Sequence, residues 1–490
     1  MTDYAGLLVE IDGDIKAGRA QIAMPKLSAL NSAQMPRQFR RPFANAARRI
    51  GMWSLGLRFL APVVNPTKSK KAVDAKPDEI AEYAVLLYKN GSIDEALARL
   101  ASITAKEVPQ APMFRAFCHM GQWDPERAIA ELRSYLSTSE DPYMSFVAQV
   151  NLSACLIWNA QLDEVVTLLD ELVATAKEKS YTRLLGNCFE LRGQARYLQG
   201  KLAHCESDLN EAARVFGPED GPDQLLVRKW RAVLQGIEKR SIEPLLAFRQ
   251  VALERQQWER VRETDLHGLK IRFDGPTMNH LVFGTPFAPY RARVEREVGR
   301  RVATDHFLFG AEGAPSLDLL TGEMSVEGSG PNPGKKIHKL LGVLLEDLYR
   351  PLPIGALFSR LFPGDYFDVF SSPNRIHQVL WRARQWIGEE NLPLEIHESE
   401  GSYSLKITGD FAFVLRLEQK PIDGLAAEWN RLESAYLGDG EFRSVQAADR
   451  LGVSATQLRR LVKWGVENGK LERVGSGSQI RYRFATLRAA

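Results

Sequence analysis

Apolar residues recur at helical spacing over most of the first 265 positions, and the alternation typical of strands is almost absent there. The clearest unit begins near Pro77 with one apolar stripe. Asn90-Gly91 interrupts the pattern, and a second stripe follows through Leu97 and Leu100. This order predicts a helix, a tight turn and a second helix. The first stripe consists of Ala81, Ala84, Val85, Leu87 and Tyr88.

Similar turn positions recur at intervals of 30, 39, 40 and 36 residues. A period in that range is typical of helical hairpins stacked into a solenoid. A small residue such as Ala96 or Ala128 would let the second helix of a hairpin approach the first closely. The pattern resembles the tetratricopeptide repeat family, and a generic bundle of α-hairpins would show it as well. The turns fall at Gly91, Gly121, Ala160, Gly200 and Gly236.

The first 76 residues also predict helical hairpins, with Gly18 at one turn, and they carry 13 basic and 5 acidic residues. The densest basic run covers Arg37–Arg41 and continues at Arg48-Arg49. Such a run could bind phosphates or an acidic partner, or it could be a solvated helix face. The most apolar stretch, 51–64, is shorter than the roughly 20 residues that a bilayer requires, which favours a buried amphipathic helix.

Prolines loosen the helical pattern over residues 276–302, and a helix is expected from Tyr290 to about Val302. Short strands are then expected over 306–309 and 316–326, the second folded at Thr321-Gly322. Helices are expected to begin at Lys335, Pro353 and Pro373. Alternation over 394–407, with a turn at Glu400-Gly401, predicts a closing hairpin.

Residues 303–418 resemble the OmpR/PhoB-type winged helix-turn-helix family. The resemblance rests on 317–322 as its strand hairpin, on 336–348, 353–362 and 374–387 as its three helices, and on Tyr403 in its wing. One face of the third helix, Ile376, Leu380, Ala383 and Ile387, has the spacing of a buried stripe. The outward stripe, which could read base edges in a major groove, is Arg375, Gln378, Arg382 and Gln385.

The wing of this unit departs from the usual basic pattern, because it reads Glu398-Ser-Glu400. Residues 331–418 carry 10 basic and 11 acidic side chains, a net charge of −1. Acidic residues repel the phosphates that supply much of the affinity for DNA. This unit could therefore bind DNA weakly, or it could serve mainly in protein contacts.

The last 72 residues, 419–490, carry 12 basic and 8 acidic side chains and contain a second helix-turn-helix pattern. Helices are expected over 444–452 and 455–469, with Ser454 capping the second, and strands on either side of the wing 475–478. This pattern resembles the small winged helix-turn-helix modules of DeoR- and GntR-type bacterial regulators. The candidate DNA contacts are Ser454, Thr456, Gln457, Arg459, Arg460, Lys463, Ser476, Ser478, Arg481 and Arg483.

Composition narrows the classes of function. The 490 residues carry 64 basic and 61 acidic side chains, so binding to nucleic acid must depend on local patches. The four cysteines form no CxxC pair, and the N-terminus is acidic; both features favour a cytoplasmic protein without a signal peptide. The adjacent pairs Cys118-His119 and His204-Cys205 are poor chelators, and Gly328–Lys335 fails the spacing of a phosphate loop. We expect no metal, no cofactor and no membrane span.

The sequence therefore predicts a mostly α protein: a helical-hairpin solenoid, TPR-like, followed by two small α+β winged-helix domains. The expected segments are 1–76, 77–275, 276–302, 303–418 and 419–490. The expected function is transcription regulation, in which the repeat array senses a protein, peptide or small-molecule signal and the winged helices bind double-stranded DNA. A protein-interaction scaffold is the alternative, and a homo-oligomer is compatible with both. We expect no enzyme; a catalytic site would have to use Asp265, His267 and His280.

Overall fold

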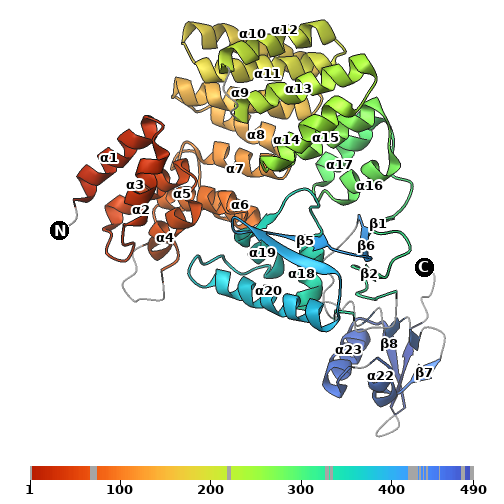
Figure 1. Ribbon diagram of the computed structural model, residues 1–490. Helices are drawn as coiled ribbons and strands as arrows, with labels where there is room; N and C mark the ends of the chain where they lie inside the picture. Colours follow the sequence, from red (N-terminus) through yellow and green to blue (C-terminus); the bar gives the residue numbers. More distant parts are fainter. Residues whose placement is uncertain are drawn as a thin grey trace. The chain divides into compact units, whose positions relative to one another are not determined.

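The computed structural model describes residues 3–66, 74–217, 222–325, 330–331, 335–417, 440–451, 453–475 and 480–485, and a few positions between 429 and 436 (Figure 1). Clustering of contacts divides the chain into two compact units. The first unit contains Met1–Ala303, Leu344–Gln378 and His397–Ser404, and the second contains Thr304–Val343, Val379–Ile396 and Leu405–Ala490.

The N-terminal part of the first unit is two helical hairpins, as the sequence predicts. The chain turns at Gly18, whose φ of 74° is readily adopted by glycine. The apolar stretch 51–64 forms a helix with six buried positions. Within the described residues, no helix has both the length and the apolar character that crossing a bilayer requires. The four helices are α1 (Tyr4–Lys16), α2 (Ala20–Ser28), α3 (Arg37–Arg49) and α4 (Trp53–Val64).

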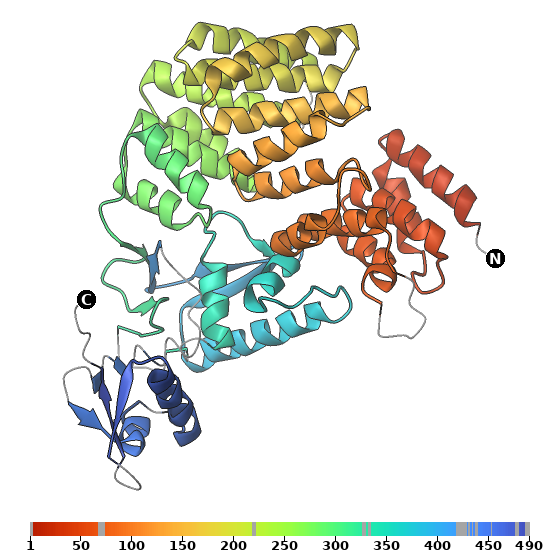
Figure 2. The same cartoon turned by 180° about the vertical axis from the view of Figure 1, so that it is seen from behind.

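Stacked helical hairpins continue through the next 190 or so residues, seen from opposite sides in Figures 1 and 2. Ala96 and Ala128 are completely buried where the paired helices meet, which confirms their expected role. The helices are α5 (Pro77–Lys89), α6 (Ile93–Ala101), α7 (Ala111–Gly121), α8 (Pro125–Leu136), α9 (Pro142–Trp158), α10 (Leu162–Glu178), α11 (Thr182–Leu198), α12 (Leu202–Phe216), α13 (Pro222–Lys239), α14 (Glu243–Glu254) and α15 (Trp258–Ile271). We call α5–α15 the array.

Two of the expected turns lie elsewhere. Gly121 is the last residue of α7, and the left-handed residue of that turn is Trp123, with φ 53°. Gly236 lies inside α13, and the turn is made at Arg240, with φ 48°. Gly236 is required for close packing instead, because a Cβ there would lie 2.6 Å from a methyl group of Leu245. The turns at Gly91, Ala160 and Gly200 do have positive φ.

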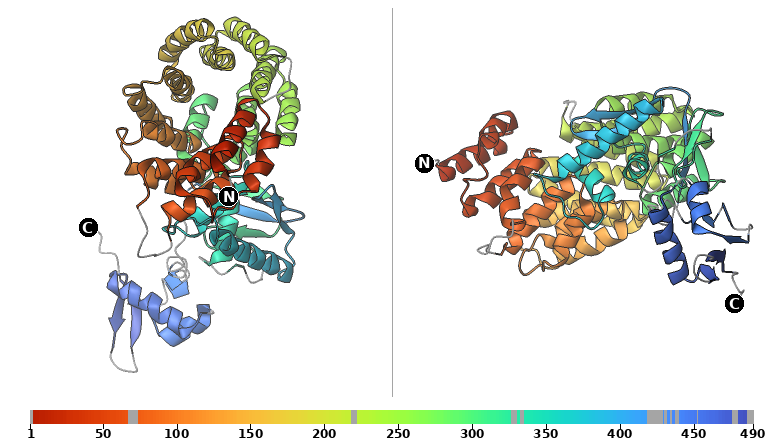
Figure 3. Two further views of the ribbon diagram at one scale, coloured as in Figure 1. Left: turned by 90° about the vertical axis from the view of Figure 1, so that its left-hand side faces the viewer. Right: turned by 90° about the horizontal axis from the view of Figure 1, so that it is seen from below.

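Two short helices follow the array, α16 (Gly275–Phe283) and α17 (Ala288–Val298). Helix α17 begins at Ala288, two residues before the expected start, and it ends earlier than expected, because Gly299 adopts a left-handed conformation with φ 71°. The left view of Figure 3 shows the array helices following an arc, with a blue-green helix of this segment inside it. The side chains of α17 contact both early and late parts of that arc, as described below.

The described part of residues 303–418 contains the three expected helices and the closing hairpin, but the first helix ends at Leu344 instead of at 348. Its sheets have the strand orders β1-β6-β2 and β3-β5-β4. The elements are β1 (His306–Gly310), β2 (Ser316–Asp318), α18 (Lys336–Leu344), β3 (Leu352–Pro353), α19 (Ile354–Leu361), α20 (Ser372–Glu389), β4 (Leu394–Ser399), β5 (Ser402–Ile407) and β6 (Ala412–Arg416).

The expected strand over 316–326 is shorter in the structure. It ends at Asp318, whose carboxylate accepts the backbone amides of Leu320 and Thr321 and so turns the chain. Strand β2 pairs in parallel with β6, which the sequence analysis did not anticipate. Of the expected hairpin the structure keeps an isolated bridge, Leu317 to Met324, and backbone hydrogen bonds from Ser325 to Ser316 at 2.8 Å and from Asp318 to Glu323 at 2.9 Å. Val326 lies outside the described residues.

Residues 344–378 pack with the array, although the sequence analysis places them in a separate domain, 303–418. Ser92 donates to the carbonyl of Gly355 at 3.1 Å, and the backbone amide of Phe367 donates to Glu95 at 2.8 Å. Gly91 leaves room for Pro353, because a Cβ on Gly91 would lie 2.8 Å from the proline ring. Helix α19 is therefore held against the turn between α5 and α6.

The C-terminal part of the second unit forms a small helix-turn-helix with a three-stranded sheet of order β7-β9-β8. Its apolar core includes the expected Ala447, Leu451, Leu458 and Leu461. We call residues 440–485 the C-terminal winged helix. Its elements are β7 (Glu441–Phe442), α22 (Ser444–Leu451), α23 (Ala455–Glu467), β8 (Leu471–Val474) and β9 (Arg481–Phe484).

Candidate nucleic-acid interface

Helix α23 begins with a capping box. The backbone amide of Gln457 donates to the Ser454 hydroxyl at 3.2 Å, and the Gln457 side chain accepts the Ser454 amide at 3.0 Å. Two amides of the first turn thus find partners within the helix end. Ser454 and Gln457, both predicted as DNA contacts, therefore stabilise the N-terminus of α23 and determine where the helix begins.

The two faces of α23 differ sharply. Leu458, Leu461 and Val462 are buried in the core of the C-terminal winged helix. Thr456, Arg459, Arg460 and Lys463 are exposed on the other side. Lys463 lies 3.7 Å from Glu467, one turn further along. Neither Arg459 nor Arg460 forms an ion pair within the part of the chain that the structure describes.

The sheet beside α23 alternates as expected: Arg481 and Arg483 are exposed, and Tyr482 lies half-buried between them. Both arginines have carboxylate partners. Arg481 lies 3.6 Å from Glu441, and Arg483 donates to Glu472 at 2.6 Å. The hydrogen bond to Glu472 raises the pKa of Arg483. The two wing serines, Ser476 and Ser478, lie outside the described residues.

Charge favours anion binding by this part of the chain. Residues 440–485 carry nine basic and four acidic side chains, a net charge of +5. Arg459, Arg460 and Lys463 lie on the exposed surface of α23, and none of them pairs with a buried carboxylate of the described residues. Arginine side chains on an exposed helix of a helix-turn-helix are the groups that contact phosphates and guanine in DNA complexes.

Helix α20 carries the other predicted DNA contacts. Its buried stripe is as expected, with Ile376, Leu380, Ala383 and Ile387 in the core. The outward residues Arg375, Gln378, Arg382 and Gln385 are all exposed.

Two of these residues have other neighbours. Arg375 pairs with Asp365 at 2.8 Å and lies 3.9 Å above the ring of Phe362, so its guanidinium is already engaged. Arg382 lines a cavity of about 480 Å³ together with Trp386 and Lys335.

The N-terminal basic run is engaged inside the fold. Arg37 pairs with Glu79 at 2.7 Å, and Arg48 pairs with Glu82 at 2.6 Å, so the run joins α3 to α5. Arg40 is buried and donates to the carbonyl of Phe59 at 2.9 Å. These three arginines are therefore engaged within the fold, whereas Arg41 and Arg49 of the same run are exposed, with Asp78 and Asp12 as their partners. The carboxylate partners of Arg37 and Arg48 lie 42 and 34 residues further along the chain, beyond the reach of a local sequence pattern.

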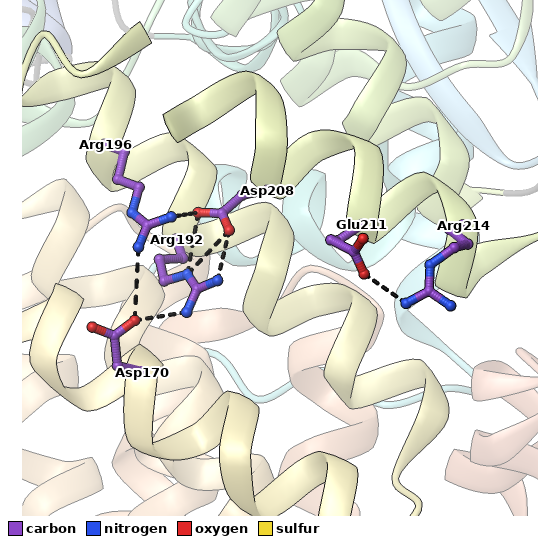
Figure 4. A network of polar contacts seen from close by, with 6 residues as sticks. All are labelled: Asp170, Arg192, Arg196, Asp208, Glu211 and Arg214. Atoms are coloured by element: carbon purple, nitrogen blue, oxygen red, sulfur yellow. Dashed lines mark hydrogen bonds and ion pairs between the residues drawn. The ribbon is translucent and has the colours of Figure 1, made fainter. Parts of the chain in front are cut away.

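A polar network joins three helices of the array (Figure 4). Arg192 and Arg196 of α11 both donate to the buried carboxylate of Asp208 on α12, at 2.6 and 2.7 Å. Arg192 also donates to Asp170 on α10 at 2.6 Å. Because both arginines have carboxylate partners, this network holds α10, α11 and α12 together and needs no external anion.

The three residues considered for catalysis do not form one site. Asp265 accepts hydrogen bonds from Arg249 at 2.7 Å and from Tyr349 at 2.9 Å, and the ring of His280 lies 5.0 Å from that of Tyr349. His267 lies apart from them, 4.8 Å from the ring of Trp230. Burial lowers the pKa of His267 to about 3.

Metal-ligating groups do not converge in the described residues, where no cluster of three or more histidine, cysteine or acidic side chains could hold an ion. The thiols of Cys118 and Cys205 are buried, and burial raises the pKa of each to about 12. His204, next to Cys205, is exposed, so the two side chains do not lie on the same face of α12 and cannot bind one metal ion together.

One group of buried charged residues is not among the sites predicted from the sequence. Arg262 of α15, Glu263 of α15 and Arg293 of α17 are almost completely buried, and each has a charged partner. The spacing i, i+3, i+4 and i+7 would have indicated it, because it places an aromatic, a basic, an aliphatic and an acidic residue on one face of α17. These residues are Tyr290, Arg293, Val294 and Glu297. Because Arg293 is charged, this face does not show the apolar pattern that usually predicts a buried helix face.

Comparisons with known proteins add little beyond this geometry. No family model matches the chain, and no curated protein matches it. Among solved structures, the chain is similar to a tetratricopeptide repeat protein from Parabacteroides merdae, with 13% identity and a TM-score of 0.33. The match covers 60% of this chain and 97% of that one. At that score the likeness carries no argument, and the description of the array as stacked helical hairpins depends on its own helices.

Proposed function

We propose that the chain binds double-stranded DNA through the C-terminal winged helix and binds a protein partner through the array. The chain would then act as a transcription regulator in which the state of the array controls the DNA-binding part. The proposal includes no catalytic step, because Asp265, His267 and His280 are not assembled into one site.

The observation that carries the DNA-binding proposal is the pair Arg459 and Arg460. Both are exposed on α23, and neither has an ion pair with a described residue. Ser454 and Gln457 fix the start of the helix, so the arginines are presented from a rigid element. A rigid helix with unpaired cations loses little conformational freedom when it binds phosphates or base edges.

The protein-binding role of the array follows from its architecture. Stacked hairpins present an extended curved surface, which repeat proteins of many kinds use to bind other proteins. Helix α19 is already held against the array by Ser92, and the chain after it is held at Phe367 by Glu95. A protein bound to the array would change the chain's behaviour only to the extent that it binds one arrangement of the array more tightly than another.

A protein scaffold remains the second candidate, and the first winged helix favours it. The predicted wing is acidic at Glu398 and Glu400, and Arg375 of α20 is engaged by Asp365. These features suit protein contacts better than contacts with DNA. In a scaffold, removal of Arg459 and Arg460 would leave every binding activity of the chain unchanged.

Equilibrium binding to a labelled 30-base-pair duplex of mixed sequence separates the two candidates. We expect the full chain to bind at low salt, and the Arg459→Ala/Arg460→Ala variant to bind at least tenfold more weakly. The matched control is Arg127→Ala/Arg214→Ala, which removes the same charge from two exposed positions of the array. Equal losses in both variants, or no binding by the unaltered chain, would exclude the DNA-binding proposal.

A further inference from the structure

Helix α17 contacts the array through one face. Its residues Tyr290, Arg293 and Val294 are 1%, 3% and 0% exposed, whereas Ala292 and Arg296 are exposed. Together with Glu297, the buried residues follow the spacing i, i+3, i+4 and i+7. This is the spacing with which a helix binds into the surface of another protein.

The contacts of this face are specific and polar. Arg293 donates to both carboxylate oxygens of Glu263, at 3.1 and 3.2 Å, and the Tyr290 hydroxyl donates to the same carboxylate at 2.8 Å. Glu297 completes the set by accepting from Lys270 at 3.0 Å. The array thus offers one buried carboxylate and one ammonium group, both on α15, to a helix that carries the opposite charges.

Aromatic residues from the early hairpins complete the seat. The ring of Tyr290 lies 4.6 Å from that of Trp123, which in turn lies 4.5 Å from Trp158. The exposed Arg296 donates to the carbonyl of Trp158 at 3.0 Å. Helix α17 therefore contacts the turn between α7 and α8, the end of α9, and α15 in the last hairpin of the array, inside the arc seen in Figure 3. We call Trp123, Trp158, Glu263 and Lys270 the inner site.

The composition of this contact is that of a binding interface more than that of a core. Tryptophan, tyrosine and arginine are the residues that contribute most to protein–protein binding, and a two-point arginine–carboxylate contact is selective for arginine. The segment itself is short: α17 has 11 residues, with Gly284 before it and the left-handed Gly299 after it. The packing of α17 on the array therefore resembles the binding of a helical peptide to a protein.

We propose that the inner site is a helix-binding site, that α17 is its resident ligand, and that a partner protein binds by replacing α17 with a helix of its own. This rests on the protein-binding role proposed for the array. The partner helix carries tyrosine, then arginine three positions later, an aliphatic residue at four and an acidic residue at seven. Such a helix leaves no buried charge unpaired, because its arginine takes over Glu263 and its carboxylate takes over Lys270. A helix without the arginine is rejected for the same reason.

The test uses the full chain with α17 unseated. A Tyr290→Ser/Arg293→Ser variant removes two anchors of the resident helix and leaves the inner site unaltered. We expect a labelled peptide of residues 286–300 with the natural sequence to bind this variant, and to bind the unaltered chain at least tenfold more weakly. The same peptide with Arg293→Ala should lose at least tenfold in affinity, whereas a peptide with Ala292→Ser, a change at an exposed position, should bind as well as the natural one.

A folded variant that fails to bind the natural peptide, or that binds the Arg293→Ala peptide equally well, would overturn the proposal. If the variant does not fold, hydrogen exchange of the unaltered chain decides. We expect the α17 amides to exchange through a local opening well before those of α9 and α11, whereas exchange of α17 only together with those helices would make it a permanent part of the core. Neither measurement involves DNA, so failure here is distinct from failure of the proposed DNA binding.

Discussion

Arg262 of α15 donates to the carboxylate of Asp347 at 2.6 Å, with both side chains buried. The same oxygen of Asp347 accepts the backbone amides of Tyr349 and Arg350, at 3.0 and 3.2 Å. One carboxylate thus fixes the turn after α18 and attaches it to the array. Together with the contacts of Ser92 and Glu95, this ion pair joins residues 344–378 to α5–α15, with which they form one compact unit.

Removal of that carboxylate should be strongly destabilising. In Asp347→Ala, Arg262 keeps its charge in a buried position without its main partner, and we expect the free energy of unfolding to fall by about 3–5 kcal/mol. Urea denaturation followed by tryptophan fluorescence measures the change. The matched control is Asp365→Ala, which breaks the exposed pair with Arg375 and should cost less than about 1 kcal/mol. Equal effects of the two changes would contradict the role assigned to Asp347.

Two helical glycines should respond to alanine in opposite directions. A Cβ at Gly236 would lie 2.6 Å from Leu245, 2.7 Å from Ile271 and 3.0 Å from the backbone oxygen of Ser241, so Gly236→Ala should lower the free energy of unfolding by about 1–3 kcal/mol. A Cβ at Gly268 in α15 meets nothing within 4 Å, so Gly268→Ala should raise it by up to about 1 kcal/mol. Thermal unfolding of both variants checks the prediction, and a stabilising Gly236→Ala would refute the assigned packing.

His267 should make the stability of the first unit depend on pH. Burial lowers the pKa of His267 to about 3 in the folded chain, in spite of Glu263 and Glu297 nearby, and Lys229 and Lys270 also disfavour its charge. The unfolded chain takes up this proton below pH 6.5, the usual value, so the stabilising effect is complete above pH 6.5 and is lost progressively as the pH falls toward 3.

Replacing the imidazole should remove this dependence. Between pH 7.5 and 5.0 the unaltered chain should lose about 2 kcal/mol more of its unfolding free energy than His267→Phe, in which the new ring packs against Trp230 and Tyr197. Urea denaturation at the two pH values gives both differences. Parallel losses in the two proteins would show that His267 titrates normally in the folded state.

The four cysteines should be unreactive until the array unfolds. All four thiols are buried, and burial raises the pKa of each to about 12, so almost no thiolate is present at pH 8. Titration with a disulfide reagent should find no reactive thiol in the folded chain and four in guanidinium chloride. Rapid labelling of any one thiol in the native protein would contradict its burial. The residues are Cys118, Cys155, Cys188 and Cys205.

The parts of the fold that sequence reasoning predicted are those that depend on local spacing. The buried stripe of α20 and the N-cap at Ser454 each involve residues within a few turns of one helix, so local spacing is enough to predict them. The same holds for the turns at Gly91 and Gly200, where a positive φ favours glycine.

The features that it missed depend on partners far along the chain. A glycine inside a helix and a glycine at a turn look alike in a sequence, and only the approach of Leu245 and Ile271 distinguishes Gly236. The arginines of α3 look like a surface patch until their partners, Glu79 and Glu82, are placed beside them. The exposure of the candidate DNA contacts on α23 could be predicted, because it follows from the helical period alone. The contacts of α17 could not, because they come from early and late parts of the array.

The dependence of DNA affinity on salt tests the central claim most directly. If α23 binds DNA phosphates, the logarithm of the association constant should fall linearly with the logarithm of salt concentration, by about 0.9 for each phosphate neutralised. The slope for Arg459→Ala/Arg460→Ala should be shallower by about 2 than that of the unaltered chain. Affinity that does not change with salt, or identical slopes for the two proteins, would contradict the assignment of α23 as the DNA-binding helix.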